Sequence, residues 1–490
     1  METEINNKYL YDGYIEPGKV FGNIYFVGTK PASTHIIDTG DGLILIDPGM
    51  PETLWIVLDN IRQLGFSEKD IKIILMSHGH YDHAGATLKL SILTGAKTYI
   101  GKDDFKMVSG EEDSSLAELF GVKFIDFFIP DVLLEDKDTI TLGNTTILCL
   151  STPGHTDGTM SFFFNTSDEK NTYLAGMHGG VGSNTLTAEF LKSNGLSFDN
   201  REKFRRGIEY AKDQNVEIFL GNHVNNNDTI GKLTKVLSGD ELAFYAPHEW
   251  HAFLDSCIKK IVALIMREDS MQKTIDLILK EKIVVIVRGV AKDKLLDFAE
   301  AAYKGGVRLL ECTYDASGNT SDEVIADNIK MLAKHFEGRM LIGAGTVLTE
   351  RQVDLTKNAG GKFIISPDTN PKIIAKTKKE GLVSIPGALT PSEAVMAHNS
   401  GADFVKLFPI SSLGSKYLKD IKAPLSHIRF LAVGGVNADN MHEFLNVGAC
   451  GFGIGSDIAN KKWIEENDFT SVENAARNYV NQIKLFEKDV

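Results

Sequence analysis

Short apolar runs alternate with turns over the first half of the chain, a pattern typical of β-strands. The most hydrophobic run, Ile71-Lys72-Ile73-Ile74-Leu75-Met76, has the length and β-branched content of a buried strand. Helical periodicity follows Pro51 and begins again near Ala84. Strands are predicted at 23–27, 34–38, 43–47, 71–76, 145–150, 159–164, 173–175 and 217–220.

The second half has a regular pattern, which begins after a predicted helix at 247–267 and a polar join, Glu268-Asp269-Ser270. Eight apolar runs, each followed by a helix-like segment, are what a (β/α)₈ barrel requires. We therefore predict an α/β chain of two domains, residues 1–268 and 269–490. The predicted barrel strands are 283–287, 308–312, 340–343, 362–365, 383–385, 404–407, 429–433 and 451–454.

Composition agrees with a soluble globular protein and narrows its partners. The 490 residues are 43% hydrophobic and 24% charged, and the net charge of −14 argues against nucleic acid or an anionic membrane as a partner. The four cysteines show no CxxC spacing, which favours free thiols in the cytosol. The start, Met1-Glu2-Thr3-Glu4, lacks an apolar core, and no apolar run has the length needed to span a bilayer. We expect a cytoplasmic protein that acts on small molecules.

A dense group of histidines directly follows the strand at 71–76. Neutral imidazole is the commonest metal ligand, and the H-x-H-x-D-H spacing lets the first two histidines chelate one ion while the last two residues turn toward a second. Each tetrahedral zinc takes three protein ligands and keeps one open position. A single histidine at a strand end is more often structural, but two such histidines complete this cluster. The predicted ligands are His78, His80, Asp82, His83, His155 and His223.

Three segments, His78-Gly79-His80-Tyr81-Asp82-His83, Pro153-Gly154-His155-Thr156 and Leu45-Ile46-Asp47-Pro48-Gly49, resemble the metallo-β-lactamase superfamily of hydrolases over about residues 15–250. The resemblance implies an αβ/βα sandwich that binds two Zn²⁺ ions. It places His78, His80 and His155 on one zinc, and Asp82, His83 and His223 on the other. Zinc activates water and polarises a carbonyl, and Asp82 is expected both to ligate the metal and to orient that water.

One position departs from the superfamily pattern. Met177-His178 stands where many members carry a bridging aspartate, which puts the occupancy of the second zinc site in question. His178 is open to three interpretations: a seventh ligand, a substrate contact or a loop residue, of which we favour the last two. The segment 178–200 is rich in Gly, Asn and Ser and is expected to form a mobile loop near the site.

A second centre is predicted around Lys406, in the apolar run Asp403-Phe404-Val405-Lys406-Leu407-Phe408-Pro409. Burial lowers the pKa of a lysine and supplies the neutral amine that attacks a ketone. The alternative is a lysine that extends to solvent from an edge strand, but a barrel has no edge. Glu311 ends the second predicted barrel strand at the mouth where catalytic groups lie. Gly434-Gly435 and Gly455-Ser456 end the last two strands, where such barrels often hold a phosphate.

These features together resemble the pyruvate aldolases that act on 2-keto-3-deoxy-6-phosphogluconate (KDPG) and 4-hydroxy-2-oxoglutarate (KHG), over about residues 272–485. The resemblance implies Lys406 as the Schiff-base nucleophile, Glu311 as the general acid/base and Thr346 as a contact of the pyruvyl carboxylate. It also implies a trimer and no cofactor in this half. The matching segments are Gly305–Thr313, Gly343–Val347, Ile385–Gly387, Val405–Pro409 and Val433–Val436.

Asp315 stands where the aldolase family often carries an arginine that binds the substrate carboxylate. An anion there would repel a carboxylate. Arg288 ends the first barrel strand at the same mouth and is expected to supply the positive charge instead. Gly434, Gly435 and Ser456 keep a phosphate contact available, although the sequence does not require a phosphorylated substrate.

The leading hypothesis is a bifunctional enzyme, a zinc hydrolase fused to a class I aldolase that releases pyruvate and an aldehyde. A sugar-acid route favours a lactonase as the first activity, and a thioester hydrolase of the glyoxalase II kind is the competing hydrolase. A different class of hypothesis leaves one half non-catalytic. In it, the zinc half is a binding or assembly module, or the barrel senses a keto acid without converting it.

Overall fold

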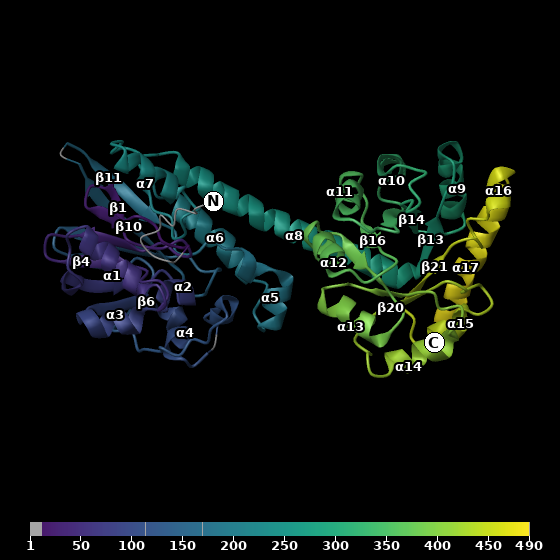
Figure 1. Ribbon diagram of the computed structural model, residues 1–490, viewed down its shortest axis with the longest axis horizontal. Helices are drawn as coiled ribbons and strands as arrows, with labels where there is room; N and C mark the ends of the chain where they lie inside the picture. The colour runs from purple at the N-terminus through teal and green to yellow at the C-terminus, as the bar shows by residue number, and fades with distance from the viewer. Residues whose placement is uncertain (1–11, 113, 169, 490) are drawn as a thin grey trace, which may run out of the picture. The chain divides into compact units, whose positions relative to one another are not determined.

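The computed structural model describes residues 12–112, 114–168 and 170–489 (Figure 1). The segment Met1-Glu2-Thr3-Glu4, for which no secretory signal is expected, lies outside these residues. The chain divides into two compact units, Met1–Leu264 and Ile265–Val490. Among the helices of the described residues, none combines the length and the apolar character needed to cross a membrane.

Two sheets form the first unit. The seven-stranded sheet runs in the order β1 to β7, with antiparallel pairs up to β4 and parallel pairs from β4 onward. The five-stranded sheet has the order β12-β11-β10-β9-β8. The first sheet contains β1 (Gly18–Phe21), β2 (Ile24–Phe26), β3 (His35–Asp38), β4 (Leu43–Ile46), β5 (Ile71–Leu75), β6 (Lys97–Gly101) and β7 (Val132–Leu134). The second contains β8 (Thr139–Leu142), β9 (Thr145–Ser151), β10 (Met160–Ser167), β11 (Thr172–Met177) and β12 (Ile218–Phe219).

Strand alternation divides the apolar residues of β4 between two layers. Ile44 and Ile46 belong to the core between the sheets, together with residues of β9, β10 and β11. Leu43 and Leu45 pack on the opposite face against the first helices of the unit. The helices of this unit are α1 (Leu54–Gln63), α2 (Tyr81–Ala84), α3 (Thr87–Thr94), α4 (Phe105–Ser109), α5 (Ala188–Ser193), α6 (Asn200–Lys212) and α7 (Thr229–Leu237).

Trp250 covers the outer face of the second sheet. It is fully buried, and its ring packs edge-on against Phe163 at 5.7 Å and Phe219 at 5.3 Å between centroids. Its indole N–H donates to the carbonyl of Ala211 in α6 at 3.2 Å. Helices therefore cover both outer faces of the sheet pair, and the αβ/βα sandwich predicted for this half is confirmed (Figure 1).

The predicted join at Glu268-Asp269-Ser270 is wrong as a break in secondary structure. Helix α8 runs without interruption from Glu249 to Glu281, across the boundary between the two units. None of the three join residues is Pro or Gly, the residues that interrupt helices most strongly, so their polarity alone does not end the helix.

The second unit is a nearly closed parallel barrel, as predicted. The strand order β17-β16-β15-β14-β13-β21-β20-β19-β18 brings its two ends together at Pro386, which has no N–H and divides one barrel strand into β17 and β18. The Lys406 N–H donates to the Pro386 carbonyl at 2.8 Å across this point. The strands are β13 (Ile283–Val287), β14 (Leu309–Thr313), β15 (Leu341–Gly345), β16 (Phe363–Ile365), β17 (Val383–Ile385), β18 (Gly387–Ala388), β19 (Val405–Leu407), β20 (Phe430–Val433) and β21 (Gly451–Ile454).

Helices surround these strands (Figure 1). Ile275 and Ile278 of α8 pack with inward-facing residues such as Leu309, Phe363 and Leu431, so the end of α8 contributes to the core inside the barrel. The remaining helices are α9 (Lys292–Lys304), α10 (Asp322–His335), α11 (Glu350–Asn358), α12 (Pro371–Lys379), α13 (Pro391–Asn399), α14 (Gly414–Lys422), α15 (Met441–Asn446), α16 (Lys461–Glu465) and α17 (Phe469–Asp489).

Candidate active sites

The histidine cluster lies where β5 ends and α2 begins. His80 is the extended residue that precedes α2, and Asp82 and His83 occupy the first turn of that helix. His78, His80 and His83 are all buried. A change from extended to helical backbone within six residues therefore directs these side chains toward a common space.

The structure gathers the six predicted ligands into two groups of three. One group is His78, His80 and His155, the other is Asp82, His83 and His223, and within each group the potential ligand atoms lie within 4.8 Å of one another. His80 Nδ1 lies 3.1 Å from His155 Nε2, and His83 Nε2 lies 3.2 Å from His223 Nε2. His83 and His223, which are 140 positions apart in the chain, thus meet at one edge of the sandwich.

In three of the ligand histidines, the Nδ1 atom already has a hydrogen-bond partner. His155 Nδ1 donates to the Gly182 carbonyl at 2.9 Å and His223 Nδ1 donates to the Pro31 carbonyl at 2.7 Å, because a carbonyl can only accept. His83 Nδ1 faces Asp47 Oδ2 at 2.8 Å. Burial acts to lower the pKa of His83, but Asp82 and Asp47 raise it above its usual value. Once this ring has lost its proton, Nε2 of His83 and of His223 both carry lone pairs, and a cation between them removes the repulsion.

The protonation states also suit a metal. Burial, and then the neighbouring imidazoles, hold the pKa values of His78 and His80 well below the usual 6.5, and burial lowers the pKa of His155 to about 4. These rings are therefore neutral at pH 7, the form that binds metal. The Nε2 atom of His78 is buried and has no hydrogen-bond partner among the described residues. The donor set fits two metal ions, with zinc as the element that such ligands favour.

Two buried carboxylates fix the loops that carry these ligands. Asp47, at the end of β4, accepts hydrogen bonds from the Ser77 N–H and hydroxyl, each at 2.7 Å, and orients His83. Asp104 accepts from the Gly79 N–H, the Thr156 hydroxyl and the Gly158 N–H, each at 2.8 Å. Asp104 therefore joins the loop of His78 and His80 to the loop of His155.

Asp104 is absent from the predicted site residues. It lies in a polar segment between β6 and α4, and no short motif marks it, because its three partners come from distant parts of the chain. Burial raises its pKa to about 6, although the three hydrogen bonds act in the opposite direction. Asp47 forms part of the quoted Leu45–Gly49 segment, but its contact with His83 is visible only in the fold.

His178 belongs to neither ligand group. It is buried, its Nδ1 accepts from the Gly180 N–H at 3.2 Å, and its Nε2 has no partner among the described residues. The segment 178–200, expected to be a loop, contains a short 3₁₀ turn (Asn184–Leu186) and α5. Through the Gly182 carbonyl it holds His155 in place.

The residues around the ligands are apolar in one hollow and acidic in a neighbouring one. Leu116, Leu119, Phe120 and Val181 provide an apolar rim next to both ligand groups. A neighbouring hollow that shares His80 and His155 is acidic, with one lysine against five carboxylates among its described residues. These charged residues are Asp103, Asp104, Glu112, Glu118, Asp157 and Lys106.

In the barrel, Lys406 and Glu311 project from β19 and β14 as a buried amine and a buried carboxyl group. Burial lowers the pKa of Lys406, and the positive charge of Arg288 adds to this effect, whereas Glu311 opposes it. Burial raises the pKa of Glu311, although Lys406 and Arg288 act to lower it. The Oε2 atom of Glu311 has no partner among the described residues, and a Cβ on Gly345 would lie 1.5 Å from its Oε1. Only glycine at 345 leaves room for this carboxylate.

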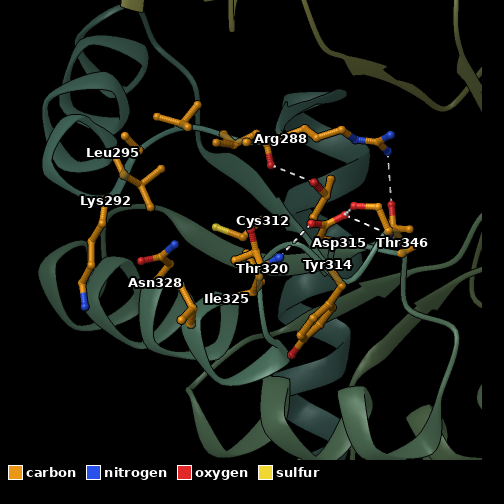
Figure 2. A pocket seen from close by; sticks show the side chains of 18 residues that line it. Arg288, Lys292, Leu295, Cys312, Tyr314, Asp315, Thr320, Ile325, Asn328 and Thr346 are labelled. Carbon is orange, nitrogen blue, oxygen red and sulfur yellow. Dashed lines mark hydrogen bonds between the residues drawn. The ribbon is translucent and has the colours of Figure 1, made fainter.

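Arg288 and Thr346 meet at the mouth of the barrel, where the Arg288 Nη2 donates to the Thr346 hydroxyl at 3.2 Å (Figure 2). Asp315 is engaged by its own loop. It accepts from the N–H and hydroxyl of Ser317 and from the Thr320 N–H at 2.9 Å. The carboxylate that would repel a substrate is thus bound to local donors, and Arg288 is placed where it can supply a positive charge.

Gly434 and Gly435 follow β20, and Ser456 follows β21, at the same mouth. Both glycines have positive φ, at 88° and 81°, and a Cβ on Gly435 would lie 2.5 Å from the Ser411 Cβ. Ser456 is exposed. These backbone amides and this hydroxyl form a corner suited to an anion.

Comparison with known proteins assigns each unit separately. The family model for KDPG and KHG aldolase matches residues 275–475, and the model for the metallo-beta-lactamase superfamily matches residues 27–168. The 2-dehydro-3-deoxy-6-phosphogalactonate aldolase of Escherichia coli (strain K12) is 32% identical over 180 residues, which are 36% of this chain and 85% of that protein. The 2-dehydro-3-deoxy-phosphogluconate aldolase of Haemophilus influenzae is 30% identical over 217 residues, 44% of this chain and 98% of that protein.

Solved structures similar to this chain include metallo-beta-lactamases. The native FEZ-1 enzyme from Legionella gormanii is 26% identical, with a TM-score of 0.49, and covers 53% of this chain and 99% of its own. The GOB-18 enzyme from Elizabethkingia meningoseptica is 31% identical, with a TM-score of 0.46, and covers 52% of this chain and 94% of its own.

Replacing Asp104 by asparagine should loosen the metal ligands without unfolding the sandwich. An amide oxygen cannot accept from all three donors, and loss of such supporting hydrogen bonds typically weakens metal affinity by about 10- to 100-fold. Competition with a chromophoric chelator measures this affinity. Asp103→Asn, at the exposed neighbouring position, is the matched control and should bind zinc like the wild type. Equal affinity of both variants would contradict the role of Asp104.

Proposed function

The chain belongs to the KDPG and KHG aldolase family through its second unit and matches the metallo-beta-lactamase superfamily model through its first, and we propose that it combines a zinc-dependent lactonase with a pyruvate-releasing aldolase. It is an enzyme with a hydrolase half and a lyase half. The buried pair Lys406 and Glu311 carries the lyase assignment, and the two groups of ligands carry the hydrolase assignment.

In the proposed lyase reaction, the neutral Lys406 amine attacks the ketone carbon of a 2-keto-3-deoxy sugar acid or of 4-hydroxy-2-oxoglutarate. The carbonyl oxygen leaves as water and an imine forms. Glu311 accepts a proton from the C4 hydroxyl, through water, as the C3–C4 bond breaks and the aldehyde departs. It returns the proton to C3 of the resulting enamine, and hydrolysis of the imine then releases pyruvate and restores Lys406. A carboxyl group whose pKa is raised by burial suits both proton transfers.

Two corners of the barrel mouth are proposed to bind the ends of this substrate. Arg288 and Thr346 bind the carboxylate, supported by their contact at 3.2 Å and by the engagement of Asp315 within its own loop. Gly434, Gly435 and Ser456 bind a phosphate at the other end where the substrate carries one. The two aldolases from Escherichia coli and Haemophilus influenzae are named for phosphorylated sugar acids, which supports that form.

In the hydrolase half, His78, His80 and His155 would hold one zinc, and Asp82, His83 and His223 the other. Zinc, when bound, supplies an activated water and polarises the scissile carbonyl. Asp82 Oδ2 lies 3.5 Å from His83 Nε2 and 3.8 Å from His223 Nε2, which supports Asp82 as a ligand of the second ion. Asp82 would also orient the activated water. His178 is proposed to contact the substrate or to have a structural role only.

The acidic hollow favours a neutral substrate. A sugar lactone is uncharged and rich in hydroxyl groups, whereas a glutathione thioester carries net negative charge and would be repelled by the carboxylates of this hollow. The apolar rim next to the ligands is the feature that favours the thioester, because it suits an acyl chain. We therefore place the lactonase first and the thioesterase second.

We also propose an oligomeric state, a domain boundary and a cellular location for this protein. Aldolases of this family are typically trimers, so we propose a trimer formed through the barrel. Light scattering on the full chain measures the oligomeric state. The division into residues 1–268 and 269–490 predicts that each half folds alone, although α8 connects them without a break. We propose a cytoplasmic location, in keeping with the free cysteines.

Sodium borohydride with pyruvate should leave a reduced adduct on Lys406, because hydride converts the imine into a stable amine. Mass spectrometry of tryptic peptides measures this. Lys406→Ala should form no adduct and release no pyruvate while keeping its zinc content, and Lys362→Ala, a lysine from the segment before β16, should behave like the wild type. An adduct on the Lys406→Ala variant would show that another amine forms the imine.

The rate of this trapping should rise with pH and level off below pH 10.5, the usual pKa of lysine. Burial lowers the pKa of Lys406, so its neutral amine is present at lower pH than that of an exposed lysine and is lost as pH falls through the lowered pKa. Initial rates with cyanoborohydride across a pH series measure the midpoint. A midpoint at or above 10.5 would mean that the lysine is not desolvated.

His80→Ala should abolish hydrolysis by the first unit and leave pyruvate release unchanged, because it removes one of three ligands of a zinc. Hydrolysis of a panel of sugar lactones and of S-lactoylglutathione by the full chain measures the first activity. Lactone hydrolysis by the wild type supports the proposal. Inactivity on every lactone with turnover of the thioester would reverse our order of substrates, and loss of both activities in His80→Ala would show an unexpected dependence of one half on the other.

A further inference from the structure

A second cavity lies beside the catalytic pair of the barrel. Its volume is about 570 Å³, within the range of small-molecule sites. Neither Lys406 nor Glu311 lines it. Instead it is bounded by Val287 and Cys312, which alternate along their strands with the inward-facing Ile286 and Glu311. The cavity therefore lies between the outer faces of β13 and β14 and the helices α9 and α10.

The floor of this cavity contains an unsatisfied polar group. Asn328 of α10 is only 6% exposed, and its Oδ1 has no hydrogen-bond partner among the described residues. A buried amide oxygen without a partner is costly, so a position of this kind calls for a ligand that donates to it. Figure 2 shows Asn328 among the side chains that line the cavity, with its amide oxygen on the side away from Cys312. Leu295 and Ile325 provide apolar walls around it.

The rim of the cavity is cationic. Arg288 and Lys292 are exposed and line it, and α9 begins there at Lys292, with no side-chain hydrogen bond capping its first turn. The positive end of the helix dipole adds to these two charges. Asp315 is the one carboxylate among the lining residues, and hydrogen bonds from Ser317 and Thr320 lower its pKa and keep it anionic, so the rim has two positive charges against one negative charge. The rim thus favours an anion, while the floor requires a hydrogen-bond donor.

Figure 2 shows Lys292 on the Asn328 side of the cavity, whereas Arg288 extends away from it toward Thr346. We propose that this cavity binds a small hydroxylated organic acid, with a hydroxyl donating to Asn328 Oδ1 and its carboxylate attracted by Lys292 and by an Arg288 side chain that turns away from Thr346. A sugar lactonase releases acids of this class. The product of the first unit would therefore bind to the second unit and change how that unit binds its keto acid. Arg288 also contacts Thr346, and a ligand that draws the guanidinium away would weaken binding of the keto acid. This antagonism rests on the proposed role of Arg288 in the aldolase, whereas binding itself does not.

Calorimetric titration of the full chain with D-gluconate tests the site. Gluconate has no ketone and cannot form an imine, so its binding is read independently of the aldolase. It should bind saturably and more tightly than sorbitol, which lacks the carboxylate, and than acetate, which lacks the hydroxyls. After pyruvate has been reduced onto Lys406, gluconate binding should persist but be severalfold weaker, because Asn328 and Lys292 stay free while the adduct holds Arg288 at Thr346. Absence of saturable gluconate binding would overturn the proposal.

Two variants locate the binding. Asn328→Leu keeps the size of the side chain and removes its amide, and should weaken gluconate by about tenfold, equivalent to the 1.4 kcal/mol of a hydrogen bond to the ligand. Lys292→Gln should weaken it severalfold, while Lys304→Gln, at the other end of α9, is the matched control and should not. Melting temperatures and borohydride trapping of pyruvate verify that Asn328→Leu is folded. Unchanged gluconate affinity in a folded Asn328→Leu would place the ligand elsewhere and overturn the site.

The antagonism has its own measurement. Gluconate should raise the pyruvate concentration needed for half-maximal trapping severalfold in the wild type, and have a smaller effect in Asn328→Leu. By linkage, pyruvate should weaken gluconate to the same degree. Gluconate binding without any effect on pyruvate would overturn the coupling through Arg288. Failure of trapping in the absence of gluconate would instead count against the aldolase, with the binding result still standing.

Discussion

Burial of polar and ionisable groups at the carboxyl ends of strands is the constraint on which both candidate sites depend. Removal of a charge or an imidazole from water is costly, and it is tolerated only where partners or function compensate. In the sandwich, Asp47 and Asp104 are buried and each accepts three hydrogen bonds. In the barrel, Lys406 and Glu311 are buried with far fewer contacts, and Glu311 Oε2 has no partner among the described residues.

This difference corresponds to two kinds of chemistry. A metal site needs ligands held rigidly in one arrangement, so its surroundings are saturated with hydrogen bonds. A Schiff-base site needs groups whose protonation changes during the reaction, so desolvation without full compensation is useful there. Burial lowers the pKa of Lys406 and raises that of Glu311, and both changes move the pair toward neutral forms.

The surroundings of the two sites differ in the sign of their charge. The hollow beside the metal ligands is acidic, whereas Arg288 and Lys292 make the barrel mouth next to α9 cationic. A neutral lactone suits the first surface, and the anionic acid formed by its opening suits the second. The electrostatics of the two units therefore agree with consecutive use of related molecules, although each site is built from its own unit alone.

The apolar pattern was sufficient for the element order of the barrel, because each of its strands is a continuous buried run followed by an amphipathic helix. It failed for strands such as β1 and β6, in which only two apolar residues follow one another, Val20-Phe21 and Tyr99-Ile100. It also failed for the supposed join at Glu268, where polarity without Gly or Pro left α8 intact. Local spacing was enough to propose His78, His80, Asp82 and His83 as ligands, since these residues share one loop.

The sequence by itself determined the residue types of both sites and the order of their strands, because motifs and periodicity are local properties. Only the tertiary structure decided how Asp104 joins the loop of His78 and His80 to the loop of His155, that Asp315 is bound within its own loop while Arg288 contacts Thr346, and where Asn328 meets a cavity. Those relations join residues far apart in the chain or depend on which face of a strand is covered. They arise from the packing of helices on sheets, which no local pattern specifies.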